Sequence, residues 1–163
     1  MKNGIIIEGA DQQFKSSICE KISEATGMPI IHYGLASDGY DYCEGYFRDV
    51  DKYETGLIFD RSYMSEIVYG PVMRNSCNIT LEKKKIIEDR FNELGYFLVV
   101  LERENPNWVI TREEYVSRDI FDKIIERYRE VYTVINIEKY FFDPAIESSL
   151  ENILKIWRRK KDD

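Results

Sequence analysis

Hydrophobic residues along this chain alternate between short apolar runs and longer stretches with an apolar residue every three or four positions. The short runs are typical of strands buried in a parallel sheet, and the longer spacing is typical of amphipathic helices. Strands are therefore predicted at residues 4–7, 28–34, 57–60, 96–101 and 134–137. Helices are predicted from 15 to the stop at 27, from about 40 to 53, at 62–69, from 80 to about 94, up to about 130, and from 144 onwards.

Two proline positions set helix limits in this prediction. The pair Gly70-Pro71 is expected to end the helix at 62–69, and Pro144 is expected in the first turn of the last helix. The regular alternation of strands and helices predicts an α/β fold, with a parallel sheet covered on both faces and ligands bound at the carboxyl ends of the strands.

The first strand leads into a turn at Gly9 and then into a helix that begins near Lys15 and Ser16. This layout is typical of a phosphate-binding loop, in which backbone N–H groups, a helix N-terminus and a lysine converge on a polyphosphate. The spacing from Gly9 to Lys15 matches the motif, but Phe14 stands where its second glycine belongs. The alternative is an ordinary helix start with a serine near the N-cap.

The third predicted strand ends in Phe-Asp-Arg-Ser, and a helix begins at once. Asp60 is suited to hold Mg²⁺ or to orient an attacking oxygen, and Arg61 is suited to bind a phosphate bidentately. One strand away from a phosphate loop, this pair favours phosphoryl-transfer chemistry. The alternative is a local pair that only caps the helix through Ser62.

Together these pieces, with the stretch Ser-Glu-Ile-Val-Tyr-Gly-Pro-Val-Met-Arg at 65–74, resemble the thymidylate kinase and deoxynucleoside kinase group of P-loop kinases. The resemblance is greatest to small phage-type deoxynucleoside monophosphate kinases and runs from residue 4 to about 138. It implies a three-layer P-loop NTPase fold with a five-stranded parallel sheet, in one domain spanning 1–163. It also implies transfer of the γ-phosphate of ATP, with Mg²⁺, to a deoxynucleoside 5′-monophosphate.

The resemblance also assigns roles to residues of this chain. ATP is expected on the loop residues Gly9, Gln12, Gln13, Phe14, Lys15, Ser16 and Ser17. Mg²⁺ is expected at Ser16 and Asp60. The acceptor nucleotide is expected at Asp11, Arg48, Arg61, Tyr69 and Arg74, with Tyr63 as another candidate for stacking on the base. A lid at about 102–118 is expected to bring Arg103, Arg112 or Arg118 over the phosphates, so the expected catalytic set is Lys15, Asp60, Arg61 and Arg112.

The composition limits which classes of binding partner are expected for this chain. The net charge of −7 argues against general affinity for nucleic acid or anionic membranes, so small-molecule nucleotides are the expected partners. No run approaches the length of a membrane span, and three cysteines without metal spacing suit a reducing, cytoplasmic setting. A single histidine, His32, makes a histidine-based metal site improbable and is expected to be structural. A homodimer built on the helices after the Asp-Arg segment is a further expectation from the resemblance.

Two alternatives remain open. A deoxynucleoside kinase of the same fold needs a carboxylate at the end of the second strand, where this chain has His32-Tyr33-Gly34, so a monophosphate acceptor is favoured. A nucleotide-binding protein without catalysis is the other alternative, and Phe14 is the argument for it.

Overall fold

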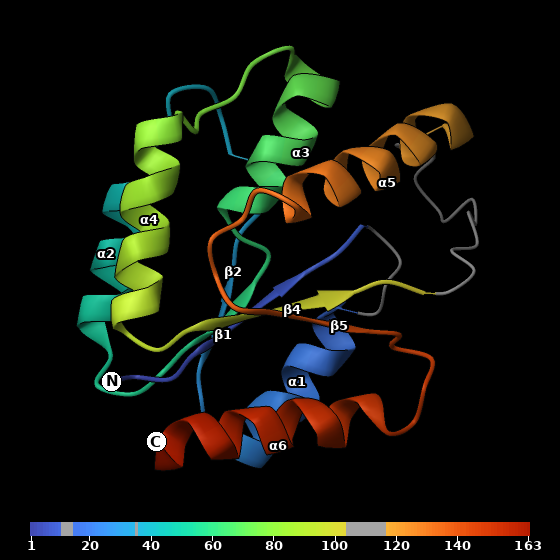
Figure 1. Cartoon of the computed structure of the whole chain (residues 1–163). Coiled ribbons are helices and arrows are strands. Elements are labelled where there is room, and N and C mark those ends of the chain that lie inside the picture. The colour runs from blue at the N-terminus through green and yellow to red at the C-terminus, as the bar shows by residue number, and fades with distance from the viewer. Residues whose placement is uncertain (11–14, 35, 104–116) are drawn as a thin grey trace.

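The computed structural model describes residues 1–10, 15–34, 36–103 and 117–163. A parallel five-stranded sheet in the order β2-β3-β1-β4-β5 forms its centre (Figure 1). The strands are β1 (Ile5–Glu8), β2 (Ile30–His32), β3 (Ile58–Asp60), β4 (Phe97–Leu101) and β5 (Lys139–Phe142). The helices are α1 (Lys15–Thr26), α2 (Tyr42–Lys52), α3 (Tyr63–Arg74), α4 (Leu81–Glu93), α5 (Arg118–Tyr132) and α6 (Ser149–Asp162). The predicted α/β class, with helices on both faces of a five-stranded parallel sheet, is confirmed.

The two faces of the sheet are covered by different helices, which makes three layers (Figure 1). Successive side chains of a strand point to opposite faces. Ile5 and Ile7 of β1 therefore pack with Ile22 of α1 and Ile153 of α6, in one buried cluster. Ile6 belongs to the other cluster, which joins the sheet to α2, α3, α4 and α5. Both chain termini lie on the side of the sheet where the strands begin, away from the carboxyl ends of the strands (Figure 1).

The strand ends are brought into line by the register of the sheet. Asp60 pairs with Ile7 on one side and with His32 on the other, and Leu101 pairs with Phe142 at the far edge. The turns after β1 and β3 therefore emerge at the same edge, where parallel α/β sheets bind ligands. No helix in the described parts of the chain is long and apolar enough to cross a membrane.

The prediction that Gly70-Pro71 ends a helix is wrong. Helix α3 continues to Arg74 and ends at Asn75, which adopts the left-handed conformation with φ 58° and donates its N–H to the Gly70 carbonyl. A proline inside a helix removes one backbone hydrogen bond and crowds the preceding turn. Here Arg74 pairs with the Glu66 carboxylate, two turns earlier, and this contact spans the proline.

Two predictions near the C-terminus are also wrong. The final strand is Lys139–Phe142 and not 134–137, where Val134 is exposed while Ile135 and Ile137 are buried outside the sheet. Helix α6 begins at Ser149 rather than at Pro144. The real edge strand is only partly buried, so it lacks the continuous apolar run that marks a central strand.

Candidate functional site

The functional candidates gather at the carboxyl edge of the sheet around β1, the central strand. After β1 the chain turns at Gly9, whose φ of 151° lies in a region that residues with a Cβ rarely adopt. Lys15 begins α1, is 7% exposed, and donates from Nζ to the Ala10 carbonyl at 2.7 Å. The lysine thus lies against the start of the loop, beside the helix N-terminus. The candidates Asp11, Gln12, Gln13 and Phe14 lie outside the described residues.

Asp60 joins the phosphate-loop helix to the second strand. Its Oδ2 accepts from Ser16 Oγ at 3.1 Å and lies 2.8 Å from His32 Nδ1. The Asp60 side chain is 7% exposed, whereas that of His32 is 65% exposed. The nearly buried Asp60 carboxylate, at the end of β3, therefore contacts both the exposed Ser16 hydroxyl on α1 and His32 at the end of β2. Ser17 is also exposed, one residue further along α1.

Arg61 follows directly and is held in an unusual backbone conformation. Its φ of 70° is left-handed, and its N–H donates to the Ile7 carbonyl at 3.0 Å. Such a conformation costs a non-glycine residue about 1–3 kcal/mol, so the surrounding structure must enforce it. The guanidinium lies 5.4 Å from the ring centroid of Tyr69, which is itself 7% exposed. The turn therefore aims a cation along the carboxyl edge, against a buried aromatic ring.

Glu8 is a buried carboxylate that holds this edge together. Its Oε1 accepts from the Ser62 N–H at 2.7 Å, from Ser62 Oγ at 2.6 Å and from the Ser65 N–H at 3.2 Å. Its Oε2 accepts from Ser65 Oγ at 2.9 Å and from the Tyr128 hydroxyl at 3.2 Å. Burial raises the pKa of the Glu8 carboxyl, and the serine hydrogen bonds and the positive charges of Arg61 and Lys15 lower it by less. Glu8 thus connects β1 to α3 and α5.

A hollow of about 360 Å³ lies beyond β3, at the carboxyl end of β2. We call it the β2 hollow. His32, Tyr33, Ser37, Arg48 and Asp49 are among its lining residues. The Tyr33 hydroxyl donates to Asp49 Oδ2 at 2.7 Å, while the Arg48 side chain is 65% exposed and lies 3.8 Å from the Asp49 carboxylate. The hollow therefore offers an exposed cation and a carboxylate held by a hydrogen bond.

Arg74 lies beside this region in a polar network rather than in the hollow itself. Its guanidinium pairs with the buried Glu66 carboxylate and donates from Nη1 to the Ala36 carbonyl at 2.6 Å. It also contacts Asp38 at 3.4 Å. The hydrogen bond to Glu66 raises the Arg74 pKa. The network fastens the loop after β2 to the end of α3.

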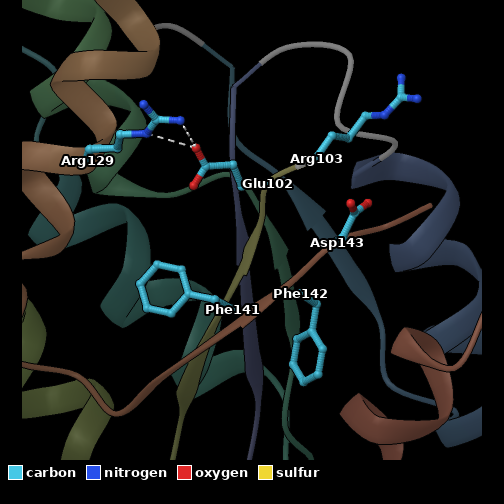
Figure 2. A pocket seen from close by; sticks show the side chains of 6 residues that line it. All are labelled: Glu102, Arg103, Arg129, Phe141, Phe142 and Asp143. Atoms are coloured by element: carbon cyan, nitrogen blue, oxygen red, sulfur yellow. Dashed lines mark hydrogen bonds and ion pairs between the residues drawn. The ribbon is translucent and has the colours of Figure 1, made fainter. Parts of the chain in front are cut away.

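A second hollow of about 360 Å³ lies on the other side of β1, at the carboxyl ends of β4 and β5 (Figure 2). We call it the β5 hollow. It is lined by Glu102, Arg103, Arg129, Phe141, Phe142 and Asp143. Arg129 donates to Glu102 Oε1 from Nε at 2.9 Å and from Nη2 at 2.7 Å, which makes one wall a fixed ion pair. Both hollows lie within the volume range of small-molecule sites.

The structure brings some of the predicted site residues together and leaves others apart. Lys15, Ser16, Asp60 and Arg61 lie together at one edge, as the motif spacing predicted. Arg48 lines the β2 hollow, whereas Tyr69 is buried beneath Arg61 and Arg74 is held by Glu66. Their roles stay predictions, as does the lid, because residues 104–116, Arg112 among them, are outside the described parts. Arg118 is exposed at the start of α5.

Two residues of this edge were not among the sequence predictions. Glu8 was not singled out, although a carboxylate that ends a buried strand just before Gly9 is itself a signal. Asp143 was not singled out, because the predicted last strand ended before it. In the described residues no group of three or more histidine, cysteine, aspartate or glutamate side chains could hold a metal ion.

The chain has a relative among known proteins, and the structure of that relative has been solved. No protein-family model matches the sequence. The chain is 30% identical over 155 residues, 90% of its length, to the SPbeta prophage-derived uncharacterized protein YorR of Bacillus subtilis (strain 168), and covers 92% of YorR. The chain belongs to the YorR family. The crystal structure of Bacillus subtilis YorR in complex with phosphorylated GDP matches it with a TM-score of 0.82 and 25% identity over 98% of both chains.

More distant structures show the same fold as the YorR family. Deoxyadenosine kinase from M. mycoides, solved with dCMP and dCDP, matches with a TM-score of 0.57 and 15% identity over 98% of both chains. Shikimate kinase from Aquifex aeolicus matches with a TM-score of 0.54 and 15% identity over 97% of both chains. The fold is therefore that of P-loop kinases, which confirms this part of the resemblance.

Proposed function

We propose that this YorR-family protein transfers the terminal phosphoryl group of a nucleoside triphosphate to a nucleoside 5′-monophosphate. Following the family resemblance, a deoxynucleotide is the expected acceptor. One observation carries the proposal: two hollows of about 360 Å³ each lie at the carboxyl edge of the sheet, one at the end of β2 and the other at the ends of β4 and β5. Lys15, Ser16, Asp60 and Arg61 lie between the hollows. Phosphoryl transfer needs this arrangement, because two substrates must meet in line at one phosphorus.

The triphosphate is assigned to the side of α1 and the β5 hollow. Backbone N–H groups at the start of α1 and the Lys15 ammonium suit its phosphates. Strands lie about 4.8 Å apart, so the β5 hollow is two spacings, about 10 Å, from the loop strand β1. A ribose and an α-phosphate bridge a distance of this order. Following the family resemblance, ATP is the first donor to test.

The residues present also fit Mg²⁺. Ser16 Oγ and Asp60 Oδ2, 3.1 Å apart, are hard oxygen donors at the end of the loop. Mg²⁺ usually keeps several waters, so two protein oxygens suffice for it. When bound, it supplies charge neutralisation for the phosphate oxygens. His32, in contact with Asp60, orients the carboxylate toward the serine.

The monophosphate is assigned to the β2 hollow. A nucleoside monophosphate carries about 1.5–2 negative charges at neutral pH, and Arg61 and Arg48 supply cations at this side. One of its phosphate oxygens attacks the terminal phosphorus. The new P–O bond forms as the bond from that phosphorus to the β-phosphate oxygen breaks, and the electron pair leaves with the nucleoside diphosphate. The attacking oxygen is already ionised, so no general base is required.

The YorR complex with phosphorylated GDP supports a nucleotide ligand for this chain. It also gives a reason to include guanine nucleotides in every ligand panel. The deoxynucleoside kinase alternative requires a carboxylate base at a 5′-hydroxyl. In this structure Asp49 is the carboxylate in the β2 hollow, and it already accepts from Tyr33.

The test is nucleoside diphosphate formation from ATP or GTP with Mg²⁺ and a panel of nucleosides and (deoxy)nucleoside monophosphates. We expect turnover that depends on one monophosphate, and a loss of at least about 10³-fold in the Lys15→Ala variant. Lys21→Ala, an exposed lysine on the same helix, is the matched control and should retain full activity. Turnover with nucleosides alone would favour the nucleoside kinase. Nucleotide binding without turnover on any acceptor would favour a binding protein.

Three parts of the expectation remain predictions beside this proposal. They are closure of a lid at 102–118, a catalytic role for Arg112, and a homodimer. Lid closure would exclude water from the transfer and bring positive charge to it.

A further inference from the structure

A third hollow lies away from the carboxyl edge of the sheet, between α3, α4 and α5. These three helices cover the same face of the sheet, opposite α1 and α6 (Figure 1). The hollow has a volume of about 770 Å³, roughly twice that of the β2 or the β5 hollow, and it falls within the range of small-molecule sites. We call it the helix hollow. Because Lys15, Ser16, Asp60 and Arg61 do not line it, its ligand is neither of the two proposed substrates.

Apolar side chains from all three helices line the helix hollow. They include Ile67 and Pro71 of α3, Leu81 of α4 and Val131 of α5, together with Val134 just after α5. Leu81 is 87% exposed and Val134 is 63% exposed, so apolar surface lies open to solvent at the hollow. A ligand that covers this surface removes it from water, which is favourable. We therefore expect a ligand with an apolar body.

The Lys84 ammonium of α4 offers the helix hollow a donor in a set position. Its Nζ donates to the Glu88 carboxylate at 3.0 Å and to the Val134 carbonyl at 2.8 Å. The Lys84 side chain is only 15% exposed, so these two contacts hold it in place. An ammonium has three N–H groups, and one is therefore left for a ligand.

The Arg127 guanidinium of α5 can turn toward a ligand at little cost. Its Nη1 donates to Glu130 Oε2 at 3.1 Å in an exposed pair three residues apart on one helix, and such pairs contribute little to stability. Its Nε is buried and has no hydrogen-bond partner among the described residues. The conformation seen thus leaves a buried donor unsatisfied, and a move toward a ligand acceptor would relieve that cost.

The donors of the helix hollow outnumber its carboxylates. Lys84 and Arg127 both line it, and Glu130 is the one carboxylate among its described lining residues. A ligand must therefore bring an acceptor of its own. An anionic acceptor suits best, because hydrogen bonds between charged groups are about twice as strong as neutral ones.

We propose that the helix hollow is a further ligand site, separate from the substrate sites, for a small amphipathic anion. The apolar body of the ligand packs against Leu81 and Val134, and its anionic group accepts from Lys84 and Arg127. This inference does not depend on the proposed function, because no residue of the phosphate-loop edge takes part in it.

The test uses two fluorescent probes with the same aromatic body. One is 8-anilinonaphthalene-1-sulfonate, an anion, and the other is N-phenyl-1-naphthylamine, which lacks the sulfonate and is neutral. In a fluorescence titration the wild type should bind the anionic probe at one saturable site. Leu81→Asp, which places a carboxylate at the hollow on an exposed residue, should weaken that binding about 10-fold or more.

Ile146→Asp is the matched control for Leu81→Asp. Ile146 is also a large apolar residue that is mostly exposed, but it does not line the helix hollow. This variant should bind the anionic probe as the wild type does. Wild-type affinity in Leu81→Asp as well would overturn the inference.

Arg127→Gln tests whether the site recognises the negative charge. It should weaken binding of the anionic probe about 10-fold and leave binding of the neutral probe unchanged, because only a charge-assisted hydrogen bond is lost. Arg158→Gln, at an exposed arginine of α6 outside the hollow, is the control and should change neither affinity. If Arg127→Gln weakens both probes equally, or neither, the site does not select an anion and the inference is wrong.

Cys77 reports where the probe binds. Its thiol is exposed and Cys77 lines the helix hollow, whereas Cys43 is partly buried and lies outside the hollow. Alkylation by N-ethylmaleimide, followed by mass spectrometry, should slow at Cys77 as the anionic probe fills the site and stay unchanged at Cys43. An unchanged rate at Cys77 would place the probe elsewhere and overturn the inference.

Sedimentation of the wild type and of Leu81→Asp tests the other occupant of such a surface, a second copy of the chain. The inference predicts that the two proteins sediment alike. A wild-type dimer that Leu81→Asp dissociates would make the helix hollow a contact between copies and would overturn the ligand site.

Discussion

Replacing Glu8 tests whether the carboxyl edge depends on its buried carboxylate. In Glu8→Ala, the N–H and the hydroxyl of Ser62 lose the acceptor they now share at 2.7 Å and 2.6 Å. Ser65 Oγ and the Tyr128 hydroxyl, 3.0 Å apart, can still bond to each other. Only one of these two hydroxyls can donate in that bond, so three buried donors are stranded: the N–H and hydroxyl of Ser62 and one O–H of the Ser65–Tyr128 pair.

Each stranded buried donor costs about 1–3 kcal/mol, and the release of a desolvated carboxylate offsets part of that cost. We expect a net loss of about 3 kcal/mol in the free energy of unfolding. For a domain of this size, that corresponds to a fall of about 6–12 °C in the melting temperature. Thermal unfolding followed by circular dichroism measures it. A Glu8→Ala protein as stable as the wild type would refute the role of Glu8 as the acceptor at this edge.

Glu8→Gln separates the charge from the hydrogen bonds. The amide oxygen can keep the bonds from Ser62, and the amide N–H groups can donate to Ser65 Oγ and Tyr128. The pKa of Glu8 is raised by burial, so the folded protein holds this proton more tightly than the unfolded chain. The contribution of Glu8 to stability is therefore full below the unfolded pKa of 4.5 and declines as pH rises through the folded pKa.

The Gln variant lacks that decline, so its melting temperature should gain on the wild type as pH rises from about 4.5. Melting temperatures of both proteins between pH 4.5 and 8 give the difference directly. A difference that is constant over this range would mean that Glu8 titrates alike in the folded and unfolded states.

Two further predictions concern the β2 side. Arg74→Ala leaves the Glu66 carboxylate, whose side chain is 0% exposed, without its cation, and should cost about 3–5 kcal/mol in urea unfolding. A double change of Glu66 and Arg74 to methionine should recover most of this loss, and no recovery would contradict the ion-pair explanation. Tyr33→Phe removes the hydroxyl that donates to Asp49 and should raise the KM for the monophosphate several-fold, with the KM for the triphosphate unchanged. Equal changes in both KM values would remove Tyr33 from the acceptor side.

The parts of the fold that the sequence predicted are those encoded locally. The loop strand, Lys15 and Ser16 lie within a few residues of each other, and Asp60 and Arg61 directly end a short apolar run. Their meeting follows from the alignment of parallel strand ends. The α/β class follows from alternating periodicities, which the central strands display strongly because they are buried on both faces.

The parts that sequence reasoning missed depend on contacts between distant segments. Glu8 meets Ser62 and Tyr128 only after three elements have packed, and no local pattern announces that meeting. Edge strand β5 is only partly buried and is exposed at Phe141, so the apolar residues at 134–137 gave a stronger but misleading signal. The Gly70-Pro71 pair favoured a helix end, and packing of α3 against the sheet, with the Arg74 contact to Glu66, outweighed that local preference.

The most direct test of two nucleotide sites facing each other across the phosphate loop is binding of a bisubstrate analogue. Two nucleosides joined by five phosphates, with adenosine or guanosine at one end and the acceptor nucleoside at the other, would occupy both hollows at once. The account predicts that it binds about 10²-fold or more tightly than either mononucleotide, because the second contact becomes intramolecular. An analogue that binds no better than the triphosphate alone would contradict the pairing of the two hollows around Lys15 and Asp60.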